Sequence, residues 1–284
     1  MLKVYDEFIS PESEHYIYSP SVTAQKTFFY PVCTGHFIYK PQYRLYRDSY
    51  DSFLIMYIQS GEMMIEFGKK KEKAGAGKFV LIDCYKPHSY YSEKGCESIW
   101  CHFDGPLART YYELAESHHG NVFSITDSCP TVKKLMAVYR TFAEKRIIKE
   151  ALLSKQLTDL LTYILLDPPK HSSEINDGER IEEMLSYMNE HFDEQVTVRE
   201  LADLAMLSPY HFIRVFKKET GFTPHEYLVN IRISTAKYML KNTRMAVKDI
   251  CYNTGFLSES AFCASFKKKT GVTPAQYRSG AEQN

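Results

Sequence analysis

Pairs of lysines recur at a fixed spacing near the C-terminal end of this sequence, at 217–218 and 267–268. Lysine ammonium groups bind phosphate oxygens. The pairs lie in two similar segments, 211–228 and 261–278, which are offset by 50 residues and identical at nine of eighteen positions. Two copies are too few for a solenoid, which needs about three or more repeats. The repeat therefore indicates two similar small units within one domain.

Each segment contains residues that begin and end short helices. Ser208-Pro209 is typical of an N-cap and a first helical residue, and Gly221 of a helix end. The same kinds of signal, including capping boxes, occur at Thr223/Glu226, Thr197/Glu200, Ser258, Gly271 and Thr273/Gln276. Short helices predicted at 198–205 and 247–255 precede the two copies after only a few linking residues. The pattern predicts two helix-turn-helix units, in which the second helix enters DNA.

The second helix of each unit, at 209–219 and 259–269, has an apolar side and a cationic side at 100° per residue. Arginine can reach guanine and apolar groups can contact thymine methyls, so the first of these helices suits base reading. The outward side chains of the helix at 259–269 are shorter, which favours contacts with phosphates. The inward residues are Phe212, Val215, Phe216, Phe262 and Phe266. The outward residues are Tyr210, Ile213, Arg214, Lys217, Lys218, Ser260, Cys263, Ala264, Lys267 and Lys268.

The charge of the chain is unevenly distributed. The 284 residues include 35 basic and 35 acidic ones, but 177–194 carry one basic against seven acidic, and 195–284 carry thirteen against seven. A basic module favours an anionic partner, with double-stranded DNA first. A membrane surface is disfavoured, because the basic helices lack a continuous large apolar face. A helical module that binds acidic protein is the alternative.

A longer helix is predicted at 224–242, between the two units. Its nineteen residues span about 28 Å, whereas successive major-groove faces lie about 34–36 Å apart. We therefore expect both units to dock on one face of the duplex and to bend it modestly. Outside a polar stripe, its side chains should be buried. These include Leu228, Ile231, Tyr238 and Met239.

Residues 181–278 resemble the AraC/XylS family of bacterial transcription regulators. The resemblance is carried by FKKETGFTPHEYL in the first unit and GFLSESAFCASFKKKTGVTPAQYR in the second. It implies sequence-specific DNA binding and control of transcription through contacts with RNA polymerase, more often as an activator than as a repressor. The family often has a larger polar side chain where this sequence has Ala264. The implied base-reading residues are Tyr210, Ile213, Arg214, Ser260, Ala261 and Ala264.

The N-terminal half consists of short β-rich runs broken by turn residues, with no long helical periodicity up to residue 120. Residues 58–68 are predicted to form two strands around a turn, and 69–77 to form the next turn. Gly75-Ala76-Gly77 is not a phosphate loop, because no helix follows it. Many short strands at this spacing predict a sandwich or barrel. Residues 25–105 resemble the cupin-type effector domain found in many sugar-responsive members of the same family.

Some cupins are metal enzymes, and their ligands include a His-x-His pair. The corresponding stretch here, 43–47, has no histidine, and only His88 stands in a ligand-like place. A transition-metal site needs three or four ligands, and His36 and His102 are not placed to complete one. No nucleophile with a neighbouring base is apparent either. We therefore expect no metal, no cofactor and no catalysis, with a cupin-type enzyme carrying a helical appendage as the alternative.

A barrel mouth with aromatic and a few polar groups is typical of a small-molecule pocket. Trp100 is the only tryptophan, and its flat face suits stacking on a sugar ring, although a tryptophan in an apolar strand is as often a core residue. The resemblance places Tyr46, Tyr90 and Trp100 near positions where sugar-binding relatives contact ligand. The candidate effector-binding residues are His36, Arg44, Tyr46, His88, Tyr90 and Trp100.

Helical periodicity returns at 131–166. Leu153, Leu157, Leu160 and Ile164 recur at intervals of four, three and four residues, which is the spacing of a coiled-coil seam. Such a seam could form a dimer interface, as helices after the barrel often do in the family. It could equally pack against the barrel of its own chain.

The predicted fold is α+β with two domains. A cupin-like β-barrel with trailing helices occupies 1–166, a linker 167–178, and an all-α domain with two helix-turn-helix units 179–284. No apolar stretch is long enough to span a membrane, and no secretory signal is apparent. Seven cysteines without a C-x-x-C pair favour free buried thiols in a reducing cytosol. We expect a cytoplasmic, homodimeric regulator whose effector is a sugar or related small metabolite.

Overall fold

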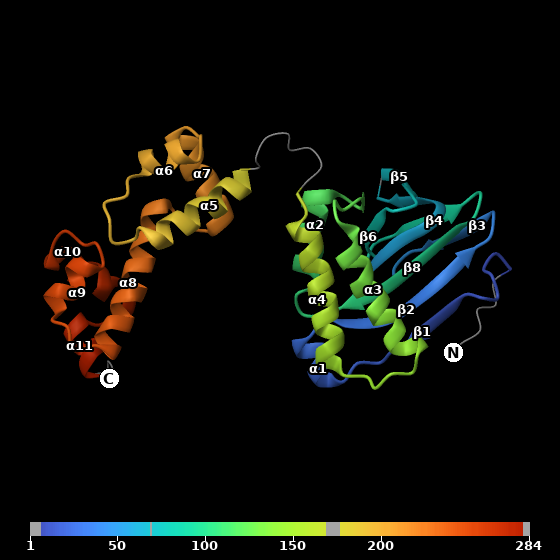
Figure 1. Ribbon diagram of the computed structural model, residues 1–284, viewed down its shortest axis with the longest axis horizontal. Coiled ribbons are helices and arrows are strands. Elements are labelled where there is room, and N and C mark those ends of the chain that lie inside the picture. The colour runs from blue at the N-terminus through green and yellow to red at the C-terminus, as the bar shows by residue number, and fades with distance from the viewer. Residues whose placement is uncertain (1–6, 69, 169–176, 281–284) are drawn as a thin grey trace. The chain divides into compact units, whose positions relative to one another are not determined.

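The computed structural model describes residues 7–68, 70–168 and 177–280. The chain forms two compact units, Met1–His171 and Ser172–Asn284 (Figure 1). Most of the predicted linker at 167–178 lies outside the described residues. Within them, no helix combines the length and apolar character needed to cross a membrane.

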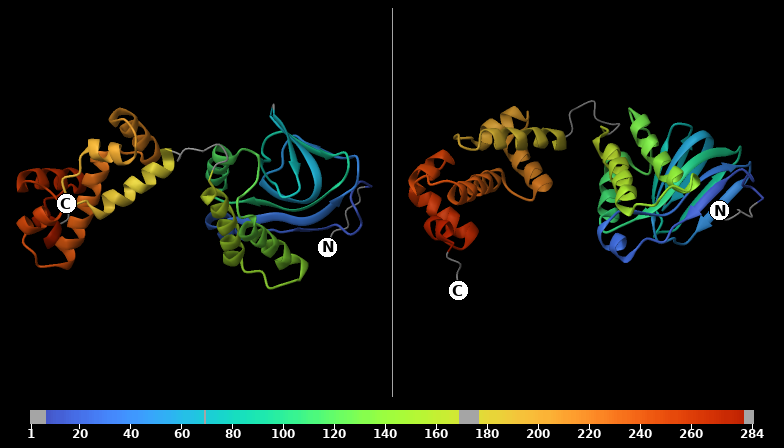
Figure 2. Two further views of the ribbon diagram at one scale, coloured as in Figure 1. Left: turned by 45° about the horizontal axis from the view of Figure 1, so that its top comes forward. Right: turned by 60° about the horizontal axis from the view of Figure 1, so that its bottom comes forward.

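The N-terminal unit is built on antiparallel strands that curve around an apolar interior (Figure 2). One row of paired strands runs β1-β2-β8-β4-β6-β9, while β3 pairs with β7, and both β5 and β7 pair with β4. The α+β architecture with a cupin-like domain is confirmed. The strands are β1 (Glu14–Ile17), β2 (Tyr30–Tyr39), β3 (Tyr43–Arg47), β4 (Phe53–Phe67), β5 (Lys70–Gly75), β6 (Phe79–Asp83), β7 (His88–Ser92), β8 (Cys96–Asp104) and β9 (Val122–Phe123).

Strand β4 corrects the prediction of two strands around a turn at 58–68. It is one strand of fifteen residues, whose first half pairs with β6 and β8 and whose second half pairs with β5 and β7. Its register with β8 shifts between Ile58 and Ser60, and Gly61 has a positive φ of 74°. A Cβ at Gly61 would collide with the Gly95 carbonyl. The glycine therefore bends the strand from one set of partners to the other.

The segment at 69–77 is likewise not a single turn, since Lys70–Gly75 forms β5. The turn is confined to the end of this segment. There Lys78 N donates to the Gly75 carbonyl oxygen at 3.1 Å, and Gly77 has a φ of 84°.

Helices cover one face of the sheet (Figures 1 and 2). Helix α2 contradicts the expectation that no long helix occurs before residue 120. It buries only Ala108, Tyr112 and Ala115, and two of these three side chains are single methyl groups, so the helix shows few strongly apolar residues in sequence. The helices of this unit are α1 (Val22–Thr27), α2 (Ala108–His119), α3 (Ser128–Ala143) and α4 (Glu150–Leu166).

The apolar seam of α4 is used within its own chain. Leu153, Leu157, Leu160 and Ile164 are all buried in one core with α3 and with the sheet residues Phe53, Leu81 and Phe103. These side chains are therefore not available to a second copy. The packing alternative is correct for this seam, and the coiled-coil alternative is wrong for it.

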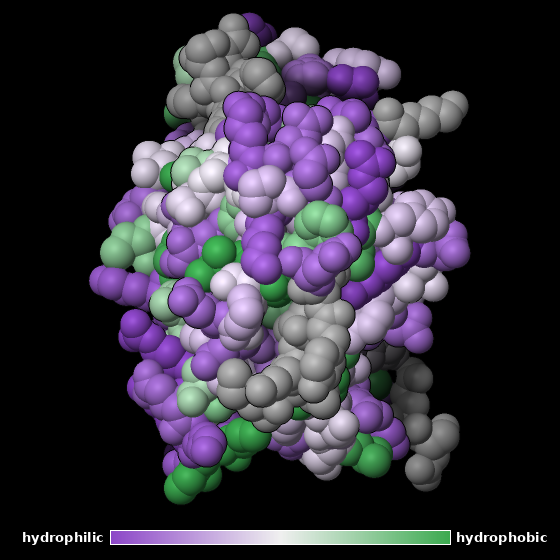
Figure 3. All heavy atoms as spheres, turned by 90° about the vertical axis from the view of Figure 1, so that its right-hand side faces the viewer, coloured by the Kyte–Doolittle hydropathy of each residue, from purple (hydrophilic) through white to green (hydrophobic). Residues whose placement is uncertain are grey.

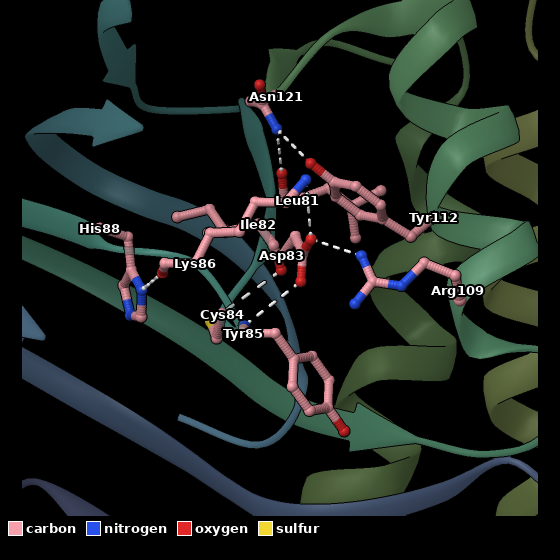
Figure 4. A network of polar contacts seen from close by, with 10 residues as sticks. All are labelled: Leu81, Ile82, Asp83, Cys84, Tyr85, Lys86, His88, Arg109, Tyr112 and Asn121. Atoms are coloured by element: carbon pink, nitrogen blue, oxygen red, sulfur yellow. Dashed lines mark hydrogen bonds and ion pairs between the residues drawn. The ribbon is translucent and has the colours of Figure 1, made fainter. Parts of the chain in front are cut away.

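An ion pair between a half-exposed arginine and a buried carboxylate joins α2 to the sheet (Figure 4). Asp83, at the end of β6, is fully buried and pairs with Arg109 of α2 and with Lys86. Nearby, Asn121 Nδ2 donates to the Leu81 carbonyl oxygen at 2.9 Å and to the Tyr112 hydroxyl at 3.1 Å. These contacts satisfy polar groups that would otherwise be buried without partners.

The C-terminal unit contains the predicted helices, and the predicted caps are confirmed. Ser208 and Ser258 cap α7 and α10, Gly221 and Gly271 end them in left-handed conformation, and all three capping boxes form. The helices are α5 (Asp177–Glu190), α6 (Val198–Leu204), α7 (Pro209–Thr220), α8 (Pro224–Asn242), α9 (Val247–Asn253), α10 (Glu259–Thr270) and α11 (Pro274–Ser279).

Helix α8 belongs to both halves of this unit. Leu228 lies in the core of the first half, and Ile233, Ala236 and Leu240 lie in the core of the second. The prediction that Tyr238 is buried is wrong, because its side chain is 68% exposed.

Arg232, also on α8, is buried instead. It donates to the carbonyl oxygens of Phe192 and Glu194, at 2.7 Å each, and lies over the Phe256 ring. Phe192 packs against the first core and Phe256 belongs to the second. Arg232 therefore joins the two halves of the unit.

Candidate nucleic-acid interface and effector pocket

Helix α7 presents the predicted two sides. Phe212, Val215 and Phe216 are buried in the first core. Tyr210 is 82% exposed, and the other predicted outward residues, Ile213, Arg214, Lys217 and Lys218, are exposed as well. The base-reading and phosphate roles of these side chains remain predictions.

Arg214 is held by a hydrogen-bonded contact that the sequence pattern did not reveal. Its Nη2 donates to His211 Nδ1 at 3.1 Å, and His211 Nε2 donates to Asp177 Oδ2, at the start of α5, at 2.9 Å. A neutral imidazole satisfies both contacts, since one ring nitrogen donates and the other accepts. Asp177 is 34 residues from His211, so helical periodicity within α7 gave no signal of this contact.

Helix α10 repeats the arrangement with smaller side chains. Phe262 and Phe266 are fully buried, and Ser260, Ala261, Ala264, Lys267 and Lys268 are exposed. Cys263 was expected to face outward, but it is half-buried against the second core. The two helix ends are also alike. Thr220 and Thr270 each donate to a phenylalanine carbonyl four residues earlier, at 2.7 and 2.8 Å.

The cations of these two faces are largely uncompensated. Lys218 pairs with its neighbour Glu219 at 3.2 Å. Across the described part of the chain, Arg214, Lys217, Lys267 and Lys268 form no ion pair with a carboxylate within 4.0 Å. Such positive faces attract anionic partners.

The interior of the N-terminal unit contains a cavity of about 340 Å³. Its lining is mainly apolar and aromatic, with a few polar groups, as in small-molecule pockets. Of the six predicted effector-binding residues, Tyr90 and Trp100 line it. The polar and aromatic lining residues that the sequence reasoning missed include His15, Phe37, Tyr39, Tyr43, Arg47, Tyr50 and His102.

Arg44 and Tyr46 lie on the outer face of β3, so their predicted place in the pocket is wrong. Successive side chains of a strand point to opposite faces, and here Tyr43, Leu45 and Arg47 are the ones that line the cavity. Tyr46 is 64% exposed and donates to Asp48 at 2.8 Å. Arg44 lies over the ring of Tyr91.

His36 and His88 also lie outside the cavity lining. His36 faces away from the interior, where its Nε2 lies 2.9 Å from Glu97 Oε1 and its ring lies near Tyr139 of α3. His88 is buried, and its Nδ1 donates to the Lys86 carbonyl oxygen at 2.8 Å (Figure 4). Burial lowers the pKa of His88. Among the residues that the structure describes, no three His, Cys, Asp or Glu side chains are grouped to hold a metal.

The ionisable groups around the cavity are mostly neutral at physiological pH. Burial, together with the positive charge of Arg47, lowers the pKa of His102 to about 3. Ser52 Oγ lies 2.9 Å from His102 Nδ1. Burial raises the pKa of Tyr50 to about 12 and that of Tyr90 further.

The cysteines are free thiols throughout the described residues, and five of them are buried. Cys129 is exposed and Cys263 is half-buried, so the expectation of buried thiols fails for these two.

Figure 3 views the end of the N-terminal unit that is turned away from its helices. The hydrophobic side chains visible there form small patches among hydrophilic ones, not one continuous apolar face.

Family models match both units. The AraC-like ligand binding domain matches residues 30–161, from β2 to α4, and a helix-turn-helix domain matches residues 201–280, from α6 to α11. The chain belongs to the AraC family of transcription regulators. The two matches assign a ligand-binding domain to the N-terminal unit and a helix-turn-helix domain to the C-terminal unit.

Curated relatives match parts of the chain. The HTH-type transcriptional activator RhaS of Enterobacter sp. (strain 638) is 28% identical over 151 residues, which are 52% of this chain and 53% of that protein. The bifunctional transcriptional activator/DNA repair enzyme AdaA of Bacillus subtilis (strain 168) is 38% identical over 102 residues, 36% of this chain and 48% of that protein. The chain thus spans about half the length of the curated relatives it matches.

A solved structure is also similar. The DNA-binding domain of AdpA, a global transcriptional factor crystallised with a target DNA, is 31% identical to the matched part of this chain. The match covers 36% of this chain and 91% of that domain, with a TM-score of 0.35.

Proposed function

We propose that this AraC-family protein is a ligand-responsive transcription regulator that binds specific DNA sites through α7 and α10. The proposal rests on one observation, the surface pattern that α7 and α10 share. In each helix a pair of phenylalanines is buried, and the opposite side exposes cations that form few ion pairs. Arg214, with Tyr210 and Ile213, reads bases, and Lys267 and Lys268 hold phosphates.

The effector occupies the cavity of the N-terminal unit. Tyrosine hydroxyls and Trp100 in its lining suit a sugar or related small metabolite. Effector binding shifts occupancy of the DNA site by no more than the difference in its affinity for the two states. The name of the activator RhaS supports an activating role. The proposal includes contacts with RNA polymerase, a homodimer and a cytoplasmic location.

The dependence of DNA affinity on salt tests the proposal. A cognate duplex is first selected from random sequences, and its affinity is then measured over a salt series. Each phosphate contact should add about 0.9 to the slope of log K against log salt. No preference for any sequence, together with binding to an acidic protein, would instead support the protein-interaction alternative.

Two substitutions separate the roles of the two helices. Arg214→Ala should relax sequence preference, at about 1–3 kcal/mol of lost discrimination, because a base contact is removed. Lys268→Ala should weaken binding to all sequences alike and lower the salt slope by about one. Equal effects of both changes on cognate and random DNA would refute the assigned roles.

A further inference from the structure

One guanidinium group lies in the lining of the effector cavity. Arg47 is half-buried on β3, and its Cζ lies 4.9 Å from the centre of the Tyr50 ring, which also lines the cavity. No carboxylate of residues 7–68, 70–168 or 177–280 lies within 4.0 Å of its nitrogens. A partly desolvated cation without a counter-ion is unfavourable, and an anion would relieve it.

A second lining residue also lacks a partner. Trp100 is 7% exposed, and its indole Nε1 is buried with no hydrogen-bond acceptor in the described structure. An indole N–H can only donate. Leaving a buried donor unsatisfied is costly, so this group is suited to a polar atom of a bound molecule.

The remaining lining adds no other charge at neutral pH. It contains no Asp, Glu or Lys among the described residues. His15 and His102 are neutral because burial lowers the pKa of each imidazole. The Tyr50 hydroxyl is neutral as any tyrosine is at this pH, and burial raises its pKa further, to about 12. The cavity therefore presents a single positive charge within apolar and aromatic walls.

We propose that the effector of this protein is a small monocarboxylate whose carboxylate pairs with Arg47 and whose body packs against Phe37 and Trp100. The inference rests on the proposed function of the cavity as the effector site. Two N–H groups of a guanidinium match the two oxygens of a carboxylate. A phosphate dianion would exceed the single charge available. The hydroxyl oxygens of a neutral sugar can accept hydrogen bonds from the guanidinium, but they leave its positive charge without a counter-ion.

Matched pairs of probes test the charge of the ligand directly. Glucuronate is compared with glucose, and benzoate with benzyl alcohol, so that each pair differs mainly in a carboxylate. Trp100 is the only tryptophan, so its fluorescence reports binding in the cavity of the full-length protein. We expect at least one carboxylate to bind about tenfold or more tightly than its neutral partner, because hydrogen bonds to charged groups are the stronger ones.

Arg47→Gln removes the charge, and Arg44→Gln is its matched control on the opposite face of the same strand. The preference for carboxylates should disappear in Arg47→Gln, be retained in Arg44→Gln and be partly kept in Arg47→Lys. Quenching of Trp100 fluorescence provides a test that needs no bound metabolite. Iodide, an anion, should quench Trp100 less in Arg47→Gln than in the native protein, whereas neutral acrylamide should quench both equally.

Tighter binding of the neutral member of each pair, with Arg47→Gln having no effect, would overturn the proposal. So would equal iodide quenching in the native and Arg47→Gln proteins. A cooperative urea unfolding transition of Arg47→Gln, followed by Trp100 fluorescence, shows that the N-terminal unit of the variant is folded. Binding of the variant to the selected duplex without ligand shows the same for the C-terminal unit. It also separates the two proposals, since a protein that recognises carboxylates but no DNA site would contradict the proposed function alone.

Discussion

Arg214 depends on side chains outside the cationic face of α7. His211 accepts from it and is itself held by Asp177 of α5. A long flexible side chain loses less conformational freedom on binding if it is already oriented. Under the proposed function, this contact orients Arg214 toward one base, and His211 itself need not touch DNA.

His211→Ala should reduce discrimination at the base that Arg214 contacts, by about fivefold, because one hydrogen bond is worth roughly 1 kcal/mol. Competition between the cognate duplex and single-base variants measures the effect. His225→Ala, at an exposed histidine of α8, is the matched control and should change nothing. An equal loss of affinity for every sequence would show that His211 only stabilises the unit.

Helix α4 has an inner apolar seam and an outer face. Leu160 is fully buried among α3 and the sheet. Leu160→Ala should lower the free energy of unfolding of the N-terminal unit by about 2–5 kcal/mol, through lost burial and the cavity left behind. Urea unfolding followed by Trp100 fluorescence measures it, since this tryptophan lies in the same unit.

Leu152→Ala is the control on the same helix, because Leu152 is 47% exposed. It should have a much smaller effect on unfolding. If Leu160 instead served a dimer interface, Leu160→Ala would dissociate the protein without lowering the stability of the unit. Sedimentation of the folded variant distinguishes these outcomes.

The C-terminal unit packs α7 and α10 against one helix, α8. Helix α8 contributes to both cores, and Arg232 ties the first half to the second. Because the halves are joined in this way, they cannot separate freely to follow a straight duplex. Of the two partners, DNA is the one that can deform at a modest free-energy cost.

We therefore expect the cognate duplex to bend by some tens of degrees when the protein binds. Gel mobility of fragments that carry the site at the centre or at the end measures the bend. Arg232→Met, which removes the tie between the halves, should reduce it. A duplex that stays straight on the native protein would contradict the expectation that both helices dock on one face.

The amino-acid sequence alone determined the helices of the C-terminal unit. Caps, glycine helix ends and the sides of α7 and α10 depend on residues within a few positions of one another. The repeat supplied the same prediction twice. For this reason Ser208, Gly221, Phe212 and Phe216 were assigned correctly without any knowledge of what they contact.

Contacts between distant residues were decided by the tertiary structure. Which side of β3 faces the interior depends on its pairing with β7, so Arg44 was chosen where Arg47 lines the cavity. Segments far away in the sequence likewise pack against the α4 seam, bury Arg232 and hold Arg214 through His211 and Asp177. A strand pattern does not show which of its two faces points inward, and an apolar helix seam does not show what it packs against. Both are settled only when the whole chain is packed.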